Sequence, residues 1–145
     1  QQELPEIVTF TGDLTDKTVF EKLVLFVKQQ YPGINILINN AAVQFNYQFV
    51  EDSNFIYKTD YEVAVNLMVP IKLTGLLLPI LLKNENSAII NVSSGLFIAP
   101  KRSASVYCAT KAALHSYSKT LRYQLEDTNT KVFEIIPALI DTPMT

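Results

Sequence analysis

Cysteine and histidine are scarce in this sequence, with one of each in 145 residues. A single cysteine cannot form an internal disulfide, so the chain is not a small secreted scaffold held together by cross-links. No cluster of cysteine and histidine has the spacing of zinc ligands, and we expect no metal site. A large excess of one charge is also absent. The net charge of -2 gives no electrostatic reason to expect nucleic acid as a partner.

Long hydrophobic runs are missing as well. The most apolar stretch, residues 73–82, is interrupted by a threonine, a glycine and a proline. A membrane-spanning helix needs about 20 apolar residues, so we expect a buried or oligomer-forming helix here and no membrane span. No secretory leader is visible in these residues, and we expect a cytoplasmic protein.

With 48% hydrophobic and 18% charged residues, the chain has enough apolar material for one domain, which we place at residues 1–145. The expected strands lie at residues 7–10, 34–38, 88–92 and 131–136. The expected helices run from about residue 18 to the stop signal Tyr31-Pro32-Gly33, then over 59–83 and 104–126. Strands separated by helices predict an α/β fold with a parallel, doubly wound sheet.

The start of the first helix carries two signals. Asp13 and Asp16 are both plausible caps, because a carboxylate can accept hydrogen bonds from the free N–H groups of a helix start. Thr18 with Glu21 has the spacing of a capping box.

Tyr107 and Lys111 are four residues apart within the expected helix 104–126, so they share one face of it. An ammonium beside a phenol favours the ionised phenol, which predicts a pKa for Tyr107 below its ordinary value of about 10. Such a phenol can act as an acid or a base near neutral pH. Ser94 follows the buried strand 88–92, and sites in open parallel sheets form where strands end. We therefore expect Ser94, Tyr107 and Lys111 to converge on one proton-transfer site.

Asn66 lies four residues before Pro70 in the expected helix 59–83. Because proline has no N–H, the carbonyl of Asn66 loses its usual helical partner, and the proline ring pushes the helix away from it. A carbonyl left free in this way can bind water, which would suit a proton relay. A bent helix with a purely structural role would have the same sequence, so both interpretations stay open.

Four motifs follow one another along the chain. They are Asn39-Asn40-Ala41-Ala42, Asn66, the spacing of Ser94, Tyr107 and Lys111, and the segment 136–142. In this order they resemble the short-chain dehydrogenase/reductase family, and the resemblance covers nearly the whole chain. The stretches 65–74 and 109–117 look most like the bacterial DltE-like oxidoreductases within that family.

The resemblance implies a Rossmann-type doubly wound parallel sheet, of which these residues would form an internal fragment. The glycine-rich turn that would hold the pyrophosphate of the cofactor is not found, and the chain has only four glycines. The first strands are therefore expected before Gln1, and the C-terminal end after Thr145. Alanine also stands where the family usually has glycine, once within residues 39–42 and once after Pro137. Both are mild changes in size.

The resemblance further implies an NAD(P)-dependent dehydrogenase or reductase, which transfers a hydride between NAD or NADP and a small carbonyl or alcohol substrate. Tyr107 would exchange the proton with the substrate oxygen, and Ser94 would hydrogen-bond that oxygen. Lys111 would hold the nicotinamide ribose and lower the pKa of the phenol. Asn66 would position a water that links Lys111 to solvent.

The same resemblance implies a set of cofactor-binding residues besides Tyr107 and Lys111. They are Asp13 and Leu14 at the adenine ring, Asn39, Asn40 and Ala41 on the adenosine side, and Pro137, Ile140 and Thr142, the last near the nicotinamide carboxamide.

Several of these residues have competing interpretations. Asp13 would be only a helix-start cap, and Thr142 only a turn residue. Ser93 competes with Ser94, which the spacing to the tyrosine favours. The sole histidine, His115, lies two helical turns beyond the tyrosine, and we expect a structural or exposed residue rather than a catalytic one.

Three functional hypotheses follow. The favoured one is the oxidoreductase. The second is a non-catalytic cofactor-binding or regulatory relative with the same fold, and the third is a structural fragment that assembles only with partners. The family commonly forms homo-oligomers, and we expect such a contact through helices 59–83 and 104–126.

Overall fold

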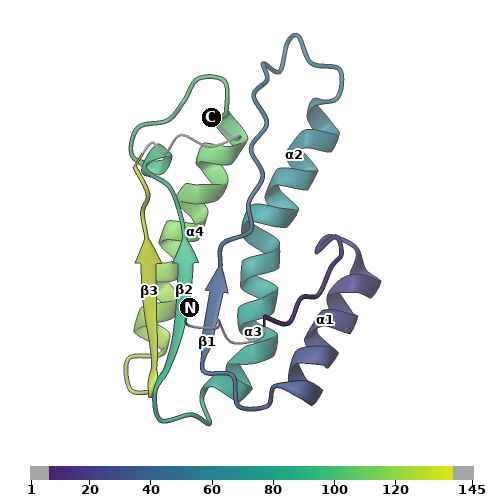
Figure 1. The fold of residues 1–145 in the computed structure, drawn as a ribbon. Helices are drawn as coiled ribbons and strands as arrows, with labels where there is room; N and C mark the ends of the chain where they lie inside the picture. The colour runs from purple at the N-terminus through teal and green to yellow at the C-terminus, as the bar shows by residue number, and fades with distance from the viewer. Residues whose placement is uncertain (1–6, 139–145) are drawn as a thin grey trace, which may run out of the picture.

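Three parallel strands form the sheet in the computed structural model of the protein, which describes residues 7–138 (Figure 1). The elements in chain order are α1 (Lys17–Gln30), β1 (Ile36–Asn39), α2 (Phe55–Val63), η1 (Ala64–Met68), α3 (Val69–Leu81), β2 (Ser87–Val92), η2 (Gly95–Phe97), α4 (Ser105–Gln124) and β3 (Thr130–Ile135). The strand order is β1-β2-β3, and both pairs are parallel. Helical crossovers join the neighbouring strands, as parallel pairing requires. The predicted α/β fold with a parallel sheet is confirmed.

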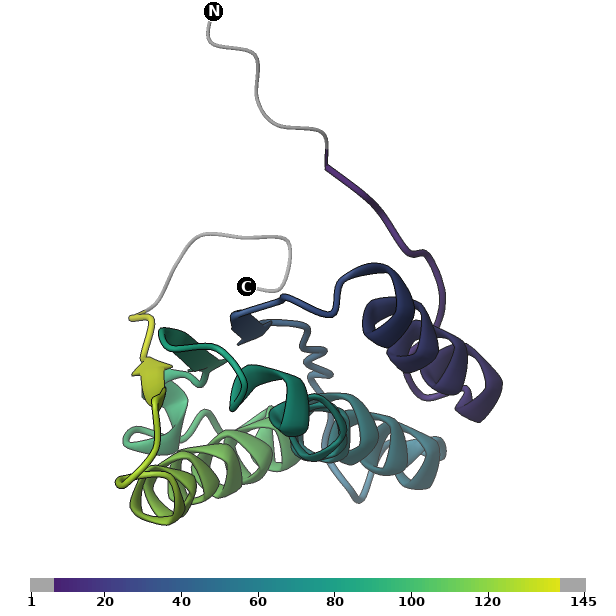
Figure 2. The same ribbon diagram turned by 90° about the horizontal axis from the view of Figure 1, so that it is seen from below.

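The helices gather on one face of the sheet (Figure 2). α3 packs against β1 and β2, α4 packs against β3, and α1 packs against α3. The side chains of β2 are alternately buried and partly exposed, as the period-two geometry of a strand dictates. On the outer strands, four large apolar side chains are exposed, namely Ile36, Ile38, Phe133 and Ile135.

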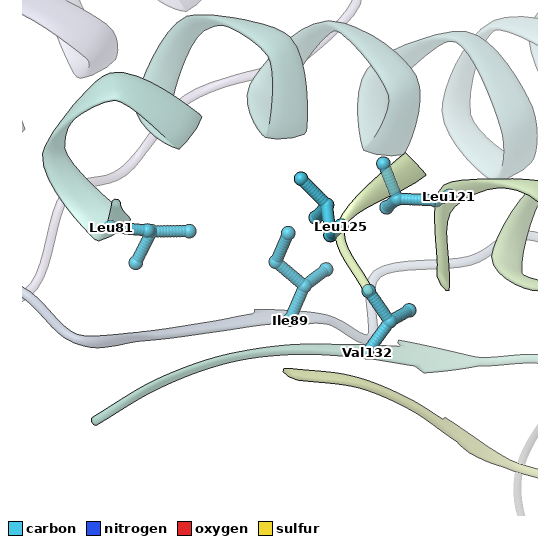
Figure 3. Close-up of a cluster of buried hydrophobic side chains, with 5 residues drawn as sticks. All are labelled: Leu81, Ile89, Leu121, Leu125 and Val132. Atoms are coloured by element: carbon cyan, nitrogen blue, oxygen red, sulfur yellow. The ribbon is translucent and has the colours of Figure 1, made fainter. Parts of the chain in front are cut away.

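The main core lies between the sheet and the ends of α3 and α4 (Figure 3). Its buried residues are Leu81, Ile89, Leu121, Leu125 and Val132. Burial of one large aliphatic side chain contributes about 1.5–3 kcal/mol, so this cluster fixes both helices on the sheet. Because α4 returns from β2 to β3, its first turn is held near the carboxyl ends of the strands.

The predicted strand at residues 7–10 is wrong for the described structure. These residues form no strand, and 77% of the surface of Ile7 is exposed. Among the described residues, β1 pairs only with β2 and has no neighbour on its other side. An apolar run becomes a strand only when an adjacent strand satisfies its N–H and C=O groups.

The first helix begins at Asp16 rather than at the predicted capping box. The Asp16 carboxylate accepts hydrogen bonds from the backbone N–H groups of Thr18 and Val19, at 2.7 and 3.2 Å. Thr18 therefore already lies inside the first turn. Glu21 forms an exposed ion pair with Lys17 on the same helix. The alternative that named Asp16 as a cap is confirmed.

The predicted helix 59–83 is a longer helix that changes its hydrogen bonding in the middle. α2, η1 and α3 run on without a break, and η1 is a π-helical turn. The N–H of Val69 donates to the carbonyl of Ala64, five residues back, just before Pro70. A proline at this position removes an N–H, and a π turn is one way to accommodate the defect. The predicted departure from α-helical bonding is confirmed, whereas the free carbonyl of Asn66 stays a prediction.

The helix from Phe55 to Leu81 is long and apolar enough to cross a membrane by length and composition alone. Core helices of proteins that never enter a membrane have the same features, and this one packs against the sheet, α1 and α4. The helix is therefore weak support for a membrane span, and the absence of a span stays a prediction.

A buried polar network ties the sheet to its helices. Asn39 and Asn91 are paired across β1 and β2, and Asn39 Nδ2 donates to Asn91 Oδ1 at 2.8 Å. Asn91 Nδ2 donates to Ser118 Oγ on α4 at 2.9 Å, and Asn39 also donates to Thr74 Oγ1 on α3 at 3.3 Å. Asn91 has no exposed surface.

Replacing Asn91 with alanine is expected to lower the free energy of unfolding by about 1–3 kcal/mol, because it leaves buried partners unpaired. Denaturant unfolding of the complete protein measures this. Asn54 is exposed and its side chain makes no capping bond, so Asn54→Ala is the matched control, with an expected change within about 0.5 kcal/mol. Equal losses in the two variants would contradict a role for the network.

Candidate active site

Ser94 lies at the carboxyl end of β2, where the chain leaves the sheet. Its Oγ accepts a hydrogen bond from Leu96 N at 3.2 Å and so starts the short helix η2. The next residue, Gly95, donates its N–H to the carbonyl of Pro137 at 3.0 Å, which joins this loop to the chain after β3. Ser93 is buried, and its Oγ donates to the carbonyl of Ile135 at 3.4 Å. The two serines therefore have different surroundings, and the catalytic role of Ser94 stays a prediction.

Tyr107 lies in the first turn of α4, with 8% of its surface exposed. Burial raises the pKa of its phenol, and the nearby Ser94 hydroxyl acts in the opposite direction. The structure thus places the phenol near the Ser94 hydroxyl, and their joint role in proton transfer stays a prediction. We expected the pKa of Tyr107 to lie below its ordinary value, and this is wrong for the described structure, where the net shift is upward. Removal from water outweighs the other influences, because it disfavours the ionised phenol.

Lys111 lies one turn further along α4, and only 3% of its surface is exposed. Its Nζ is 5.5 Å from the centroid of the Tyr107 ring and donates to the carbonyl of Val92 at 2.8 Å, at the end of β2. Burial lowers the pKa of Lys111 from 10.5 to about 8. The amine is still mostly protonated at neutral pH, but it can give up a proton far more readily than an exposed lysine.

Asn66 connects the helix η1 to two other parts of the site. Its Oδ1 accepts from the N–H of Val43, and its Nδ2 donates to the carbonyl of the same residue, both at 2.8 Å. Nδ2 also donates to Thr110 Oγ1 at 3.2 Å, on the helix that carries Tyr107. The side chain has no exposed surface and is occupied by these structural bonds. Any contact of Asn66 with water would therefore use its backbone carbonyl, and that role stays a prediction.

The predicted cofactor residues near α1 have other partners in the structure. The Asp13 carboxylate accepts from the N–H and the hydroxyl of Thr15, both at 2.8 Å, and from the Tyr61 hydroxyl at 3.3 Å. The backbone hydrogen bond from Thr15 is the main reason why the pKa of Asp13 is lowered. Leu14 packs beside the cluster that joins α1 to α3.

The remaining predicted cofactor residues follow strand ends. Asn39 is buried in the network under the sheet, whereas Asn40 and Ala41, which follow β1, are exposed. Pro137 is partly buried beside Gly95. Ile140 and Thr142 lie outside the described residues.

The sole histidine makes contacts with β3 and η2, and its expected structural role stays a prediction. His115 Nδ1 is 2.8 Å from Glu134 Oε2 on β3, and its ring stacks on Phe97 with centroids 4.3 Å apart. Phe97 belongs to η2, so the pair holds the loop that starts at Ser94 against α4.

One buried charged residue was missed by the sequence reasoning. Glu62 precedes Asn66 by four residues on the same helical face, has no exposed surface, and accepts a hydrogen bond from Phe45 N at 2.8 Å. Its spacing from Asn66 was a usable signal, because residues at i and i+4 on a helix face the same neighbours.

Comparison with known proteins identifies the family. The family model for short chain dehydrogenases matches residues 1–145. The chain belongs to the short-chain dehydrogenase/reductase family. It is 40% identical over 142 residues to the uncharacterized oxidoreductase DltE of Bacillus subtilis, covering 98% of this chain and 56% of that protein. The resemblance to the DltE-like oxidoreductases is therefore confirmed.

A second relative in this family is an uncharacterized oxidoreductase of Staphylococcus epidermidis, 32% identical over 135 residues, which cover 93% of this chain and 58% of the relative. The short-chain dehydrogenase chain thus spans little more than half the length of these curated relatives.

Solved structures share the fold. A 3-oxoacyl (acyl-carrier-protein) reductase of Agrobacterium tumefaciens with NADP bound superposes with a TM-score of 0.80 at 24% identity, over 91% of this chain and 50% of that chain. A closed form of serine dehydrogenase complexed with NADP+ gives a TM-score of 0.79 at 25% identity, over 89% of this chain and 52% of that chain. The three-stranded sheet described above is therefore part of the Rossmann-type sheet of this family.

Proposed function

We propose that the complete protein is an NAD(P)-dependent oxidoreductase that interconverts a small carbonyl compound and its alcohol. The observation that carries the proposal is the buried phenol of Tyr107, which lies near the Ser94 hydroxyl and beside the Lys111 ammonium at the carboxyl end of the sheet. Open parallel sheets bind their ligands at this edge. The relatives with solved structures and bound NADP support the choice of cofactor.

The residues present fit the nicotinamide end of such a cofactor. An ammonium has three donors, and among the described residues Lys111 Nζ uses one of them, on the carbonyl of Val92. Two donors remain for the hydroxyls of a ribose. When bound, the nicotinamide supplies or accepts a hydride. The chain's own residues must therefore orient the substrate and move the proton.

In the reducing direction, Tyr107 gives its phenolic proton to the substrate oxygen, while Ser94 Oγ donates a hydrogen bond to the same oxygen. The phenolate left behind is costly in a buried site, and the Lys111 ammonium beside it stabilises that charge. The lowered pKa of Lys111 lets this residue pass a proton back to the phenolate. The Lys111 ammonium stabilises Tyr107 only as the negative charge develops on the phenol oxygen, which is when the proton is transferred.

The proposal is tested with the complete protein and a panel of aldehydes and ketones, by following NADPH and NADH consumption. We expect turnover of at least one carbonyl compound, with kcat/KM for reduction falling as the pH rises through about 8, because deprotonated Lys111 no longer stabilises the phenolate. NADPH binding without turnover of any compound would instead support the non-catalytic relative.

We further propose a homo-oligomer that forms through the helix 55–81 and α4. Large apolar side chains at the start of the helix 55–81 are exposed, with 63% of the surface of Ile56 and 64% of the surface of Tyr57 accessible. Contiguous exposed apolar residues on a helix are typical of protein contacts. Light scattering of the complete protein measures the oligomeric state, and a monomer at all concentrations would contradict this contact.

A further inference from the structure

Glu62 is a carboxyl group in an unusual environment. It has no exposed surface, and among residues 7–138 no lysine, arginine or histidine forms an ion pair with it. Lys111 is the other charged residue that is buried among the described residues. It donates its hydrogen bond to the backbone carbonyl of Val92 and not to Glu62. An unpaired buried carboxylate is strongly destabilising, and such groups usually avoid this by staying protonated.

The two carboxyl oxygens of Glu62 differ in their partners. Oε1 accepts the N–H of Phe45 at 2.8 Å, whereas Oε2 is buried without a partner among the described residues. Burial raises the pKa of Glu62, and the hydrogen bond from Phe45 opposes this only in part. A neutral carboxylic acid has one oxygen that accepts and one that carries a proton. An oxygen without a partner costs less in the neutral acid than in the charged carboxylate, so the contacts favour the neutral form.

Glu62 belongs to a stripe of polar residues that binds the segment 43–47. Thr59, Glu62 and Asn66 follow one face of the helix, and their partners along the segment are Tyr47, Phe45 and Val43 in turn. Every second residue of the segment is therefore fixed by one turn of the helix. Glu62 is the central of the three contacts.

The same segment is also attached to the chain just before α4. The N–H of Tyr47 donates to the carbonyl of Ser103 at 2.8 Å, and Ser103 Oγ donates to Asn46 Oδ1 at 3.2 Å. The segment 43–47 thus connects the helix of Glu62 to the start of the helix that carries Tyr107. Loosening the Glu62 contact is expected to loosen the support of the phenol.

The charge of Glu62 also matters for Tyr107 directly. A negative charge on Glu62 raises the pKa of Tyr107, which opposes formation of the phenolate. The titratable and charged side chains on the elements packed around Glu62 lie on α4, on the segment 43–47 and on α2. They are Tyr107, Cys108, Lys111, His115, Tyr117, Lys119, Arg122 and Tyr123 on α4, Tyr47 on the segment, and Tyr57, Lys58, Asp60 and Tyr61 on α2. A neutral Glu62 spares the proton-transfer site an adjacent negative charge.

We propose that Glu62 is a positioning residue of the proton-transfer site, which binds the segment 43–47 as a neutral carboxylic acid and keeps negative charge away from Tyr107. This role rests on the proposed oxidoreductase function. Glu62 acts through the segment and through its lack of charge, without touching the substrate.

The protonation state is tested by melting the complete protein at pH 5 to 8, in the parent and in Glu62→Gln. An acid with a raised folded-state pKa keeps its proton in the folded state while the unfolded chain loses it, so stability falls as the pH rises above the ordinary value of 4.5. Glutamine has no such loss. We expect the Tm of Glu62→Gln minus that of the parent to grow by about 3 °C or more over this range. A difference independent of pH would overturn the neutral acid.

The positioning role is tested with Glu62→Gln, which keeps an accepting oxygen, and Glu62→Met, which does not. In Glu62→Met, amide hydrogen exchange within residues 43–47 is expected to be about tenfold faster, and kcat/KM about tenfold lower, because one buried hydrogen bond is lost. Glu62→Gln should restore both to within about threefold of the parent. The exposed Asp60→Asn, on the same helix, is the matched control.

Two outcomes would overturn the positioning role. One is unchanged exchange and turnover in Glu62→Met, and the other is a Glu62→Gln variant as impaired as Glu62→Met. Hydrogen exchange and melting do not require turnover. A parent protein that converts no carbonyl compound would therefore refute the proposed function, while these two measurements still decide the state and the contact of Glu62.

Discussion

Replacing Tyr107 with phenylalanine is expected to lower kcat by about 10²- to 10⁴-fold, the usual contribution of a positioned acid or base. The substitution removes only the hydroxyl, and the ring keeps its place in a site where 8% of the residue is exposed. Binding of NADPH should therefore stay close to that of the parent. Steady-state kinetics on the complete protein and a fluorescence titration with NADPH measure the two effects.

Tyr123→Phe is the matched control for this substitution. Tyr123 lies on the same helix, but 63% of its surface is exposed, so its hydroxyl is not expected to matter. A Tyr107→Phe enzyme with undiminished turnover would refute the assignment of the proton donor. A large loss of NADPH binding in the same variant would mean that the hydroxyl holds the cofactor rather than the proton.

Replacing Lys111 with methionine is expected to have opposite effects on stability and on activity. Burial shifts the pKa of Lys111 from 10.5 to about 8, which corresponds to ~3 kcal/mol of unfavourable free energy when the amine is charged. Methionine avoids that penalty but leaves the carbonyl of Val92 without its partner, at a cost of about 1 kcal/mol. The variant should therefore be more stable than the parent at pH 7 by about 2 kcal/mol, while turnover and NADPH binding both fall.

The sign of this effect depends on pH. A lysine with a lowered folded-state pKa binds fewer protons in the folded than in the unfolded state between pH 8 and 10.5, so the parent gains stability as the pH rises through that window. The advantage of Lys111→Met is expected to be full below about pH 8 and to disappear near pH 10.5. Urea unfolding at several pH values measures it, with the exposed Lys119→Met as control. A destabilised Lys111→Met at pH 7 would show that the lysine contributes net stability.

Much of the fold could be predicted from local patterns. The apolar run before Asn91 and the alternation of strands and helices predict β2 and the parallel sheet, because strand and helix periodicity are properties of neighbouring residues. The expectation that Ser94, Tyr107 and Lys111 meet at one end of the sheet came from a different rule, namely that sites in open parallel sheets form where strands end. The strand at 7–10 failed because pairing depends on a partner that a local pattern does not contain.

The details of the site were less predictable. A defect in the helix at Pro70 was foreseen, since a missing N–H is visible in the sequence, but its form as a π-helical turn was not. The sequence offered both Asp16 and Thr18 as caps of α1. The choice of Asp16 depends on where the backbone first becomes helical, which the structure shows to be Lys17. Glu62 was missed because a carboxylate on a helix is ordinarily solvated. Its spacing from Asn66 places it on the same helical face, and the packing of the segment 43–47 and α4 buries it there.

By itself the sequence determined the alternation of helices and strands from α1 onward, the family and the residues that could move a proton, because these depend on identity and spacing along the chain. The tertiary structure decided how those residues behave. Burial makes the pKa of Tyr107 rise and that of Lys111 fall, although their spacing alone predicts a stabilised phenolate. The direction of each shift depends on how much water the packing removes, and contacts between segments far apart in the chain set that amount.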